Sequence, residues 1–299
     1  FARYGCDMEE YESCLCSVLE AAPNIIIDDG GDLVGMIHEK RPDLGEAVWG
    51  GCEETTTGVI RLKAMEREGV LKFPMVAVND ADCKHLFDNR YGTGQSVWDS
   101  VMRNTNLIIA AKTVVVAGYG WCSRGIAMRA KALGAKVIVT EINPVKAIEA
   151  RMDGFDVMKM EQAAPLGDIF VSATGCCKTI TVEHMLTMKE GAILTNAGHF
   201  NYTTLFRSKT IVKELYVKGR LVNIAAADGH PAEVMDMSFA VQALSAMYIK
   251  DNYRQLENKV IDVSEEIDDI VSRRKLAAWG VEIDELTDEQ KSYLNSWQV

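Results

Sequence analysis

Short apolar runs separated by helical patterns dominate the middle of the chain. The runs are rich in valine and isoleucine, are bounded by glycine or polar residues, and are spaced as in a parallel α/β fold. They occupy residues 114–118, 136–141, 168–175, 191–199 and 219–226, and helical patterns cover 126–133 and 145–152. Each run ends in a small or polar residue, where an open α/β sheet places its ligands. The pattern predicts a doubly wound parallel sheet in a domain spanning 93–228.

The N-terminal part has fewer strand-like runs. Two of them, at 24–32 and 72–80, predict that residues 1–92 form part of a second α/β domain. A methionine-rich helix is predicted over 232–253, and we expect residues 229–260 to return to this second domain. The sequence therefore predicts a doubly wound domain inserted into a partial α/β domain.

The C-terminal part, residues 261–299, has helical periodicity throughout. Ser264 is a candidate N-cap for its first helix, and Thr287 with Gln290 forms a candidate capping box for its second. We expect a helical C-terminal element.

Composition narrows the class of protein. A length of 299 residues suggests about two domains, and the net charge of −11 disfavours nucleic acid and anionic membranes as partners. No apolar run is long enough to span a membrane. The 8 cysteines include no C-x-x-C pair and no cysteine pair with histidine at zinc-ligand spacing. We therefore expect no metal site and a reducing, cytoplasmic location.

The first of the central apolar runs leads into a glycine loop that is close to a dinucleotide-binding fingerprint. Gly118 would make the tight turn, Gly120 would let the backbone approach a pyrophosphate, and Ser123 stands at the third glycine position. Gly125 would keep the following backbone open. Glu141 ends the next run, where a carboxylate binds the ribose 2′-hydroxyl and repels a 2′-phosphate, so NAD is favoured over NADP. The alternative is a tight strand–helix turn without a ligand.

Other stretches are unusually polar for their positions. They are IIIDDGGD (25–32), EETTTGV (53–59), VNDADCKHLFDN (78–89), NAGHF (196–200) and NIAAADGHP (223–231). Taken singly, such stretches are typical of turns, helix N-caps or surface ion pairs. Together with the glycine loop, and in this order over nearly the whole chain, they closely resemble the S-adenosylhomocysteine hydrolase family, most of all its archaeal branch.

The resemblance implies a reaction. In the family, a tightly bound NAD oxidises the 3′-hydroxyl of the substrate's ribose, homocysteine leaves by elimination, water adds, and the ketone is reduced again. It implies reversible hydrolysis of S-adenosylhomocysteine to homocysteine and adenosine by a cytoplasmic homo-oligomer, a tetramer by resemblance. Three alternatives stay open: hydrolysis of S-inosylhomocysteine, a catalytically impaired NAD-binding relative, and an ordinary NAD-dependent dehydrogenase that would release NADH.

The resemblance also implies roles for individual residues. The catalytic group would be Lys84, Asp88, Asn89, Asp29 and His199. Lys84 and Asp88 would address the 3′-hydroxyl, and Asn89 would orient Lys84. The substrate contacts would be Asp29, Glu54, Thr55, Lys84, Asp88 and His230. The cofactor contacts would be Thr55, Thr56, Thr57, Gly118, Gly120, Ser123, Gly125, Glu141, Thr174, Asn196, Gly198, His199, Asn223 and His230.

Three features depart from the family. The chain begins at Phe1, inside the family's substrate domain, without the upstream His-Met-Thr motif. We therefore expect the protein to start further upstream, and this chain alone to have an exposed sheet edge and to turn over poorly or not at all. The run NYTTLFRSK (201–209) does not match the family, and a genuine change and a sequence error both stay open. The Lys/Tyr tail that reaches a neighbouring subunit's NAD in many members has no match.

Overall fold

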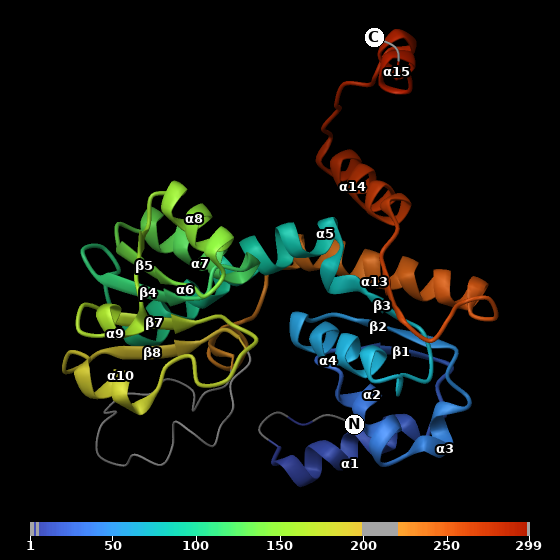
Figure 1. Ribbon diagram of the computed structural model, residues 1–299, viewed down its shortest axis with the longest axis horizontal. Helices are drawn as coiled ribbons and strands as arrows, with labels where there is room; N and C mark the ends of the chain where they lie inside the picture. Colours follow the sequence, from blue (N-terminus) through green and yellow to red (C-terminus); the bar gives the residue numbers. More distant parts are fainter. Residues whose placement is uncertain (1–2, 4–5, 199–220, 298–299) are drawn as a thin grey trace.

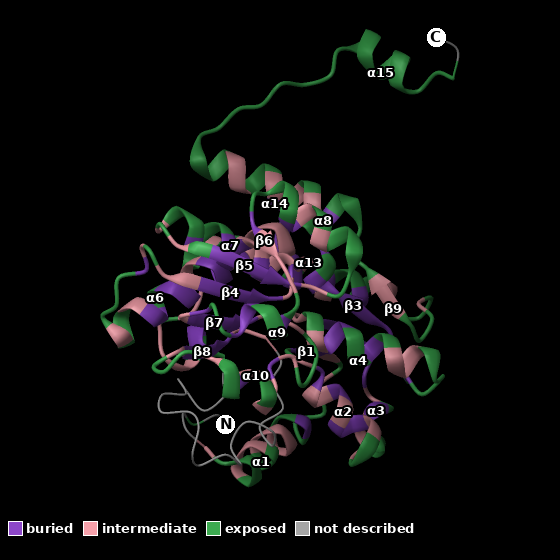
Figure 2. Ribbon diagram, turned by 60° about the vertical axis from the view of Figure 1, so that its left-hand side comes forward, coloured by how far each residue is buried: buried purple, intermediate pink, exposed green. Residues whose placement is uncertain are grey.

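The protein is built from two parallel β-sheets flanked by helices (Figure 1). The computed structural model describes residues 3, 6–198 and 221–297. Predictions from the sequence concern His199 and the segment 201–209, and both lie outside the described residues. The central strands of the larger sheet are almost completely buried, and hydrophobic clusters lie on both faces of this sheet (Figure 2). The predicted α/β class is confirmed.

The smaller sheet has four parallel strands in the order β1-β2-β3-β9. Its strands are β1 (Ile25–Asp28), β2 (Gly50–Glu53), β3 (Met75–Ala77) and β9 (Val260–Asp262). Its helices are α1 (Met8–Leu19), α2 (Asp32–Glu39), α3 (Pro42–Gly45) and α4 (Thr56–Arg67). Strand β9 crosses the expected boundary at 260/261, because the C-terminal part first adds a strand beside β3 before it turns helical. The edge strand β1 leaves Ile27 55% exposed.

The larger sheet has five parallel strands in the order β6-β5-β4-β7-β8. Its strands are β4 (Thr113–Ala117), β5 (Lys136–Thr140), β6 (Asp156–Val157), β7 (Ile169–Ser172) and β8 (Ile193–Asn196). Its helices are α7 (Trp121–Ala132), α8 (Pro144–Met152), α9 (Met160–Ala163) and α10 (Val182–Thr187). The order reverses beside β4, so the loops after β4 and β7 meet at a point where such sheets bind ligands.

The prediction of a strand over 219–226 is wrong for residues 221–226, which are the part that the structure describes. Residues Val222–Ala225 form a helical turn, α12. Val222 and Asn223 are both buried while Ile224 is 60% exposed, a pattern that one helical turn gives and a strand does not. An apolar run this short does not distinguish a strand from a buried helical turn by its pattern alone.

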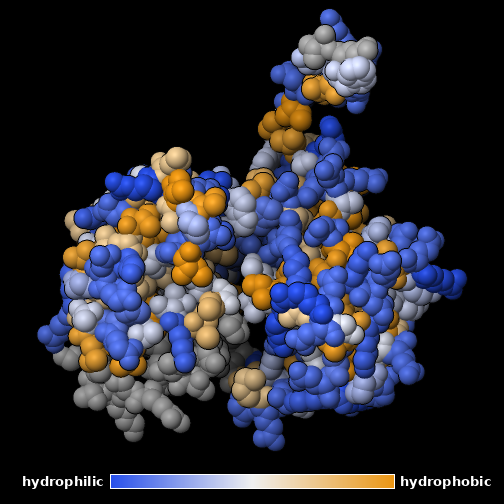
Figure 3. Space-filling view, viewed as in Figure 1, coloured by the Kyte–Doolittle hydropathy of each residue, from blue (hydrophilic) through white to orange (hydrophobic). Residues whose placement is uncertain are grey.

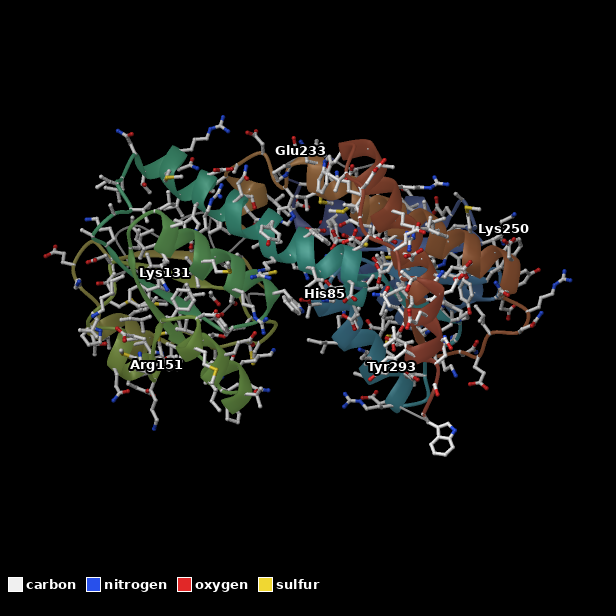
Figure 4. All side chains as sticks on the ribbon, turned by 90° about the horizontal axis from the view of Figure 1, so that it is seen from above. His85, Lys131, Arg151, Glu233, Lys250 and Tyr293 are labelled. Carbon is white, nitrogen blue, oxygen red and sulfur yellow. The ribbon has the colours of Figure 1, made fainter. Side chains whose placement is uncertain are left out.

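A continuous helical stretch links the two sheets (Figure 1). It consists of the turn η1 (Val78–Asp80), α5 (Asp82–Lys84), the wide π-helical segment η2 (His85–Gly92) and α6 (Thr93–Thr105). The long helix α13 (Ala232–Asn252) packs against η2, α5 and β2. His85 and Trp121 face each other at a ring distance of 4.7 Å, and Figure 4 shows His85 midway between the two halves of the molecule. These elements hold the carboxyl ends of both sheets near one another.

The C-terminal element forms two helices, α14 (Glu265–Trp279) and α15 (Asp288–Leu294), as predicted. The Thr287–Gln290 capping box is present, whereas Ser264 occupies the N-cap of α14 without a side-chain hydrogen bond. Figure 1 shows α15 projecting away from both sheets. Within the described part of the chain, no helix is both long and apolar enough to cross a membrane.

Candidate active site

Lys84 is the centre of a buried polar network. Its side chain is 5% exposed, and its Nζ donates to Asn89 Oδ1 at 2.7 Å and to Asn79 Oδ1 at 3.2 Å. Asp88 Oδ2 lies 3.4 Å from the same nitrogen and Glu54 Oε1 lies 3.5 Å from it. The π-helical segment explains how Lys84 reaches residues both four and five positions later, because its wider turn places both on one face. Such segments are frequent at functional sites.

Asp88 joins Lys84 to the opposite wall of the site. Its Oδ1 lies 2.5 Å from His230 Nδ1, and its Oδ2 accepts from the Ser238 hydroxyl at 2.8 Å. Burial by itself would raise the pKa of Asp88. The hydrogen bond from His230 and the charge of Lys84 outweigh burial and hold this pKa far below its usual range. Asp88 is therefore a carboxylate at neutral pH.

Glu54 directly follows β2 and approaches Lys84 from the smaller sheet. Its Oε2 accepts from Gln242 Nε2 at 2.5 Å, while its Oε1 is buried and has no hydrogen-bond partner among the described residues. Burial raises the pKa of Glu54, and the charge of Lys84 opposes that rise. A buried carboxylate oxygen that accepts no hydrogen bond from the described residues is suited to accept one from a ligand hydroxyl.

The turn after β2 positions the threonines of the predicted cofactor group. The buried Glu53 accepts from the backbone N–H groups of Gly30 and Thr55, both at 2.8 Å, and from the Thr55 hydroxyl at 2.9 Å. Thr55 caps α4, and Thr56 follows on its first turn and accepts from Asn79 at 3.1 Å. Glu53 thus ties this turn to the loop that carries Asp29.

Asp29 and Thr57 lie at the rim of this region. Asp29 follows β1 directly, and its side chain is exposed. Desolvation by the surrounding protein still raises its pKa, and the charge of Lys84 opposes the rise. Thr57 is half-buried on the first turn of α4. Asp29 therefore comes from the loop after β1, and Thr57 follows the turn after β2 that carries Glu54.

The glycine loop follows β4 and opens α7. Gly118 has a φ of +96°, and a Cβ there would lie 2.8 Å from Thr174 Cγ2, so both conformation and space require glycine. A Cβ on Gly120 would meet no atom within 4 Å, and this residue caps α7 without any side-chain hydrogen bond. Gly120 thus leaves open space at the N-terminus of α7, as a site for a pyrophosphate requires.

The residues predicted to complete the loop act in two different ways. Ser123 is fully buried, and its hydroxyl donates to the Ala173 carbonyl at 3.1 Å, so it ties α7 to the end of β7. Gly125 faces the linking helices: a Cβ there would lie 1.7 Å from the Arg90 carbonyl oxygen. The structure thus explains Gly125 by close packing of α7 against η2, rather than by an open backbone.

Glu141 lies at the end of β5, as predicted for a ribose-binding carboxylate. Its oxygens accept from the backbone N–H groups of Tyr119 at 2.7 Å, Ile142 at 2.7 Å and Asn143 at 2.9 Å. One carboxylate therefore fixes the glycine loop to the next strand. Its charge remains at the position where a 2′-phosphate would be repelled.

The remaining predicted cofactor residues lie at strand ends around the same loop. Thr174 follows β7, Asn196 ends β8, and Asn196 and Gly198 hydrogen-bond to each other at 2.7 and 3.2 Å. Asn223 Nδ2 lies 3.1 Å from His230 Nε2, and its buried Oδ1 has no hydrogen-bond partner within the described ranges. An orphaned acceptor beside the Lys84 network suits an amide N–H donor, such as a carboxamide.

The structure brings together most of the predicted site residues. The Lys84 network, the threonine turn and the glycine loop lie around one region between the two sheets, and Figure 3 shows a hollow between the two halves of the molecule. The open space above Gly120, the uncapped start of α7 and the orphaned Asn223 oxygen fit a dinucleotide.

Three residues of the network were not singled out from the sequence. Asn79 bonds both Lys84 and Asn89, and Ser238 and Gln242 hold Asp88 and Glu54. Ser238 and Gln242 lie on α13, which the sequence identified only as a methionine-rich core helix. Their signal was present as two polar residues four positions apart on a largely apolar helix.

Comparisons with known proteins give one consistent answer. A family model described as S-adenosyl-L-homocysteine hydrolase, NAD binding domain, matches residues 89–230. The chain is 57% identical to the S-inosyl-L-homocysteine hydrolase of Methanocaldococcus jannaschii, with 100% of this chain and 77% of that protein aligned. It is 55% identical to the adenosylhomocysteinase of Pyrococcus abyssi, with 100% of this chain and 76% of that protein aligned.

A solved structure shows the same kind of fold. The chain is similar to the A chain of dipicolinate synthase from Bacillus subtilis, with a TM-score of 0.51, 14% sequence identity and 70% of each chain covered. At this identity the likeness concerns the fold alone.

Proposed function

This chain belongs to the S-adenosyl-L-homocysteine hydrolase family, and we propose that it catalyses the reversible, NAD-dependent hydrolysis of S-adenosylhomocysteine to homocysteine and adenosine. The observation that carries the proposal is the buried amine of Lys84, held by Asn79 and Asn89 between two carboxylates. This group lies beside the glycine loop, as a reaction that oxidises and later reduces a ribose requires.

NAD is the cofactor of this family, and when bound it supplies a hydride acceptor and then a hydride donor. Gly118, Gly120 and the start of α7 would hold its pyrophosphate, Glu141 its ribose and Asn223 its carboxamide. Thr55, Thr56, Thr57, Ser123, Thr174, Asn196 and Gly198 would complete its surroundings.

The Lys84 network supplies the proton transfers at the substrate's ribose. We propose that Glu54 and Asp88 accept hydrogen bonds from the ribose hydroxyls, and that Lys84 mediates proton transfer at the 3′-hydroxyl through Nζ. The two carboxylates within 3.5 Å stabilise its ammonium form. His230, held by Asp88, would line the purine side of the substrate.

Asp29 would act on the neighbouring ribose positions. Its raised pKa suits a group that accepts a proton and returns it near neutral pH. In this proposal Asp29 assists proton transfer at the 4′ and 5′ positions of the substrate.

The purine base of the substrate is the part that similarity does not assign. The aligned relatives include both adenosyl- and inosylhomocysteine hydrolases at 55% and 57% identity, so similarity does not separate the two substrates. We keep S-inosylhomocysteine as the second candidate substrate.

We also propose a cytoplasmic homo-oligomer, a tetramer by family resemblance. All 8 cysteines are free, which accords with a reducing compartment. The C-terminal arm exposes Trp279, Val281, Ile283 and Leu286 by 46–59%, and Figure 3 shows its apolar surface. Exposed apolar side chains on a projecting segment favour contact with another chain. Light scattering of the purified chain would give the number of subunits.

The direct test is to incubate the purified chain with each of the two thioether substrates and to measure the released homocysteine thiol. We expect release from S-adenosylhomocysteine, and no release from a Lys84→Ala variant. Release from S-inosylhomocysteine alone would replace the proposed substrate, and equal release by the variant would contradict the proposed site.

A further inference from the structure

The helical turn that carries Lys84 lacks a cap of its own. Helix α5 begins at Asp82 and is preceded by Ala81, whose side chain offers no acceptor. The first N–H groups of a helix have no partners within the helix and need acceptors from elsewhere. Here the acceptors come from the C-terminal helix α14.

Asp268 on α14 supplies them with a single carboxylate. Its Oδ2 accepts from the Asp82 N–H at 2.9 Å, and its Oδ1 accepts from the Cys83 N–H at 2.8 Å. The Cys83 thiol also donates to the Asp268 carbonyl oxygen at 3.3 Å. Three contacts thus fix the two residues immediately before Lys84.

Packing around Asp268 makes this cap rigid. Ile267 and Val271 are 8% and 3% exposed, and they belong to the same hydrophobic cluster as Ala81 and Cys83. Asp268 itself is half-buried, so its hydrogen bonds face little competition from water. A shift of α14 would therefore shift the turn below it.

Lys84 has little tolerance for such a shift. Its Nζ must lie between Asn79, Asn89, Glu54 and Asp88 at 2.7–3.5 Å. We propose that Asp268 is a positioning residue for Lys84: it caps the turn that carries the lysine and so makes the C-terminal helix part of the active-site scaffold. The functional half of this inference rests on the proposed function.

The chain offers a matched control. Asp269 is the next residue of the same helix, and its carboxylate pairs with Arg273 on the exposed face. Asp269→Ala removes the same charge from the same turn without touching α5. Asp268→Asn keeps one acceptor oxygen and is the milder variant should Asp268→Ala fold poorly.

The first two measurements need no turnover. Amide hydrogen exchange at Asp82 and Cys83 reports the cap, and the rate at which an amine-acylating reagent labels Lys84, with other lysines as references, reports its position. In Asp268→Ala we expect both rates to rise at least about tenfold, because the cap and the burial of Nζ are lost. Asp268→Asn should be intermediate and Asp269→Ala unchanged.

The third measurement is homocysteine release. We expect kcat of Asp268→Ala to fall about 10- to 100-fold with KM and bound NAD within about threefold of the unchanged chain, because misplacement of a catalytic group acts mainly on the chemical step. The inference would be overturned if the reagent labelled Lys84 of Asp268→Ala at the same rate as Lys84 of the unchanged chain. An unchanged kcat would overturn it as well. Absence of turnover in the unchanged chain would count against the proposed function instead.

Discussion

At the scale of single residues, the site depends on how burial and neighbouring charges act on a few carboxyl groups. Asp88 and Glu54 flank the same amine, yet the pKa of Asp88 is lowered and that of Glu54 is raised. The difference arises because His230 and Ser238 donate to Asp88, whereas one oxygen of Glu54 accepts no hydrogen bond from the described residues. Two carboxylates of different basicity around one lysine suit a reaction with several proton transfers.

Lys84 itself can be tested by substitution. We expect Lys84→Ala to lower kcat at least about 100-fold, since general acid–base groups contribute on that order. Bound NAD should stay near the level of the unchanged chain, because Lys84 Nζ hydrogen-bonds to Asn79 and Asn89 and not to the described residues of the glycine loop. Lys63→Ala, which removes an exposed lysine paired with Asp80, is the control. A Lys84→Ala chain with full kcat would contradict the proposed role.

Glu53 makes stability depend on pH. Burial raises the pKa of Glu53 to about 7 from 4.5, so the folded protein retains a proton there that the unfolded chain releases. The folded state is then stabilised below about pH 4.5, and this stabilisation is lost as the pH rises toward about 7. We expect Glu53→Gln, which keeps a neutral group and an acceptor oxygen, to remove this loss, which is at most about 3 kcal/mol.

Urea unfolding at pH 5 and at pH 7.5 measures the effect. The free energy of unfolding should fall more between these values in the unchanged chain than in Glu53→Gln. Glu68→Gln, at the exposed end of α4, should behave like the unchanged chain. Identical pH dependence in the unchanged chain and Glu53→Gln would contradict the buried, protonated state of Glu53.

The sequence identified the residues of this site through family resemblance, and it could not supply their contacts. Asn79, Ser238 and Gln242 were missed because a single asparagine, serine or glutamine carries no distinctive spacing. Their importance comes from burial and from contacts across 150 and 188 residues for the two on α13. Such long-range contacts depend on tertiary packing, which local patterns do not encode.

At the scale of elements, the glycines of the loop divide into one that faces open space and one that allows close packing. Gly120 faces open space, whereas Gly125 packs closely against the Arg90 carbonyl. The sequence assigned both to the cofactor, because a glycine in a loop motif does not reveal which neighbour comes close. The linking segment η2 supplies that neighbour.

This division gives a paired test. We expect Gly125→Ala to lower the free energy of unfolding by about 3 kcal/mol or more, because its methyl group would overlap the Arg90 carbonyl. We expect Gly120→Ala to fold with stability within about 0.5 kcal/mol of the unchanged chain but to retain less NAD, since the methyl group fills the space of the pyrophosphate. Thermal unfolding and the nucleotide content of the purified chains measure the two effects; equal stability of both variants would contradict the division.

Element prediction succeeded where runs were long and failed where they were short. The runs that became β4, β5, β7 and β8 were predicted, because buried parallel strands form continuous apolar segments. The strand β9, with 3 residues, and the helical turn α12, with 4, were missed or assigned wrongly. Their conformations are set by the partner β3 and by the buried Asn223, respectively.

At the scale of the whole molecule, the two sheets share one site through the linking helices. Lys84 and Asp88 come from the linking segment, Glu54 from the smaller sheet, and the glycine loop from the larger sheet. The tilted rings of His85 and Trp121 pack together across the same junction, and Arg124 lies over the Trp121 ring at 4.4 Å. Any movement of one sheet relative to the other therefore moves Lys84 and Asp88 relative to the glycine loop.

The central claim is that the cofactor is reduced and reoxidised within each turnover, so that a thioether is hydrolysed without net redox change. One progress curve tests it: homocysteine release from S-adenosylhomocysteine, recorded together with absorbance at about 340 nm, where NADH absorbs. We expect homocysteine to accumulate, even if slowly, over many turnovers while the absorbance reaches a level no higher than the enzyme concentration. An absorbance that rises in step with substrate consumption, without homocysteine, would contradict the account and identify an ordinary dehydrogenase.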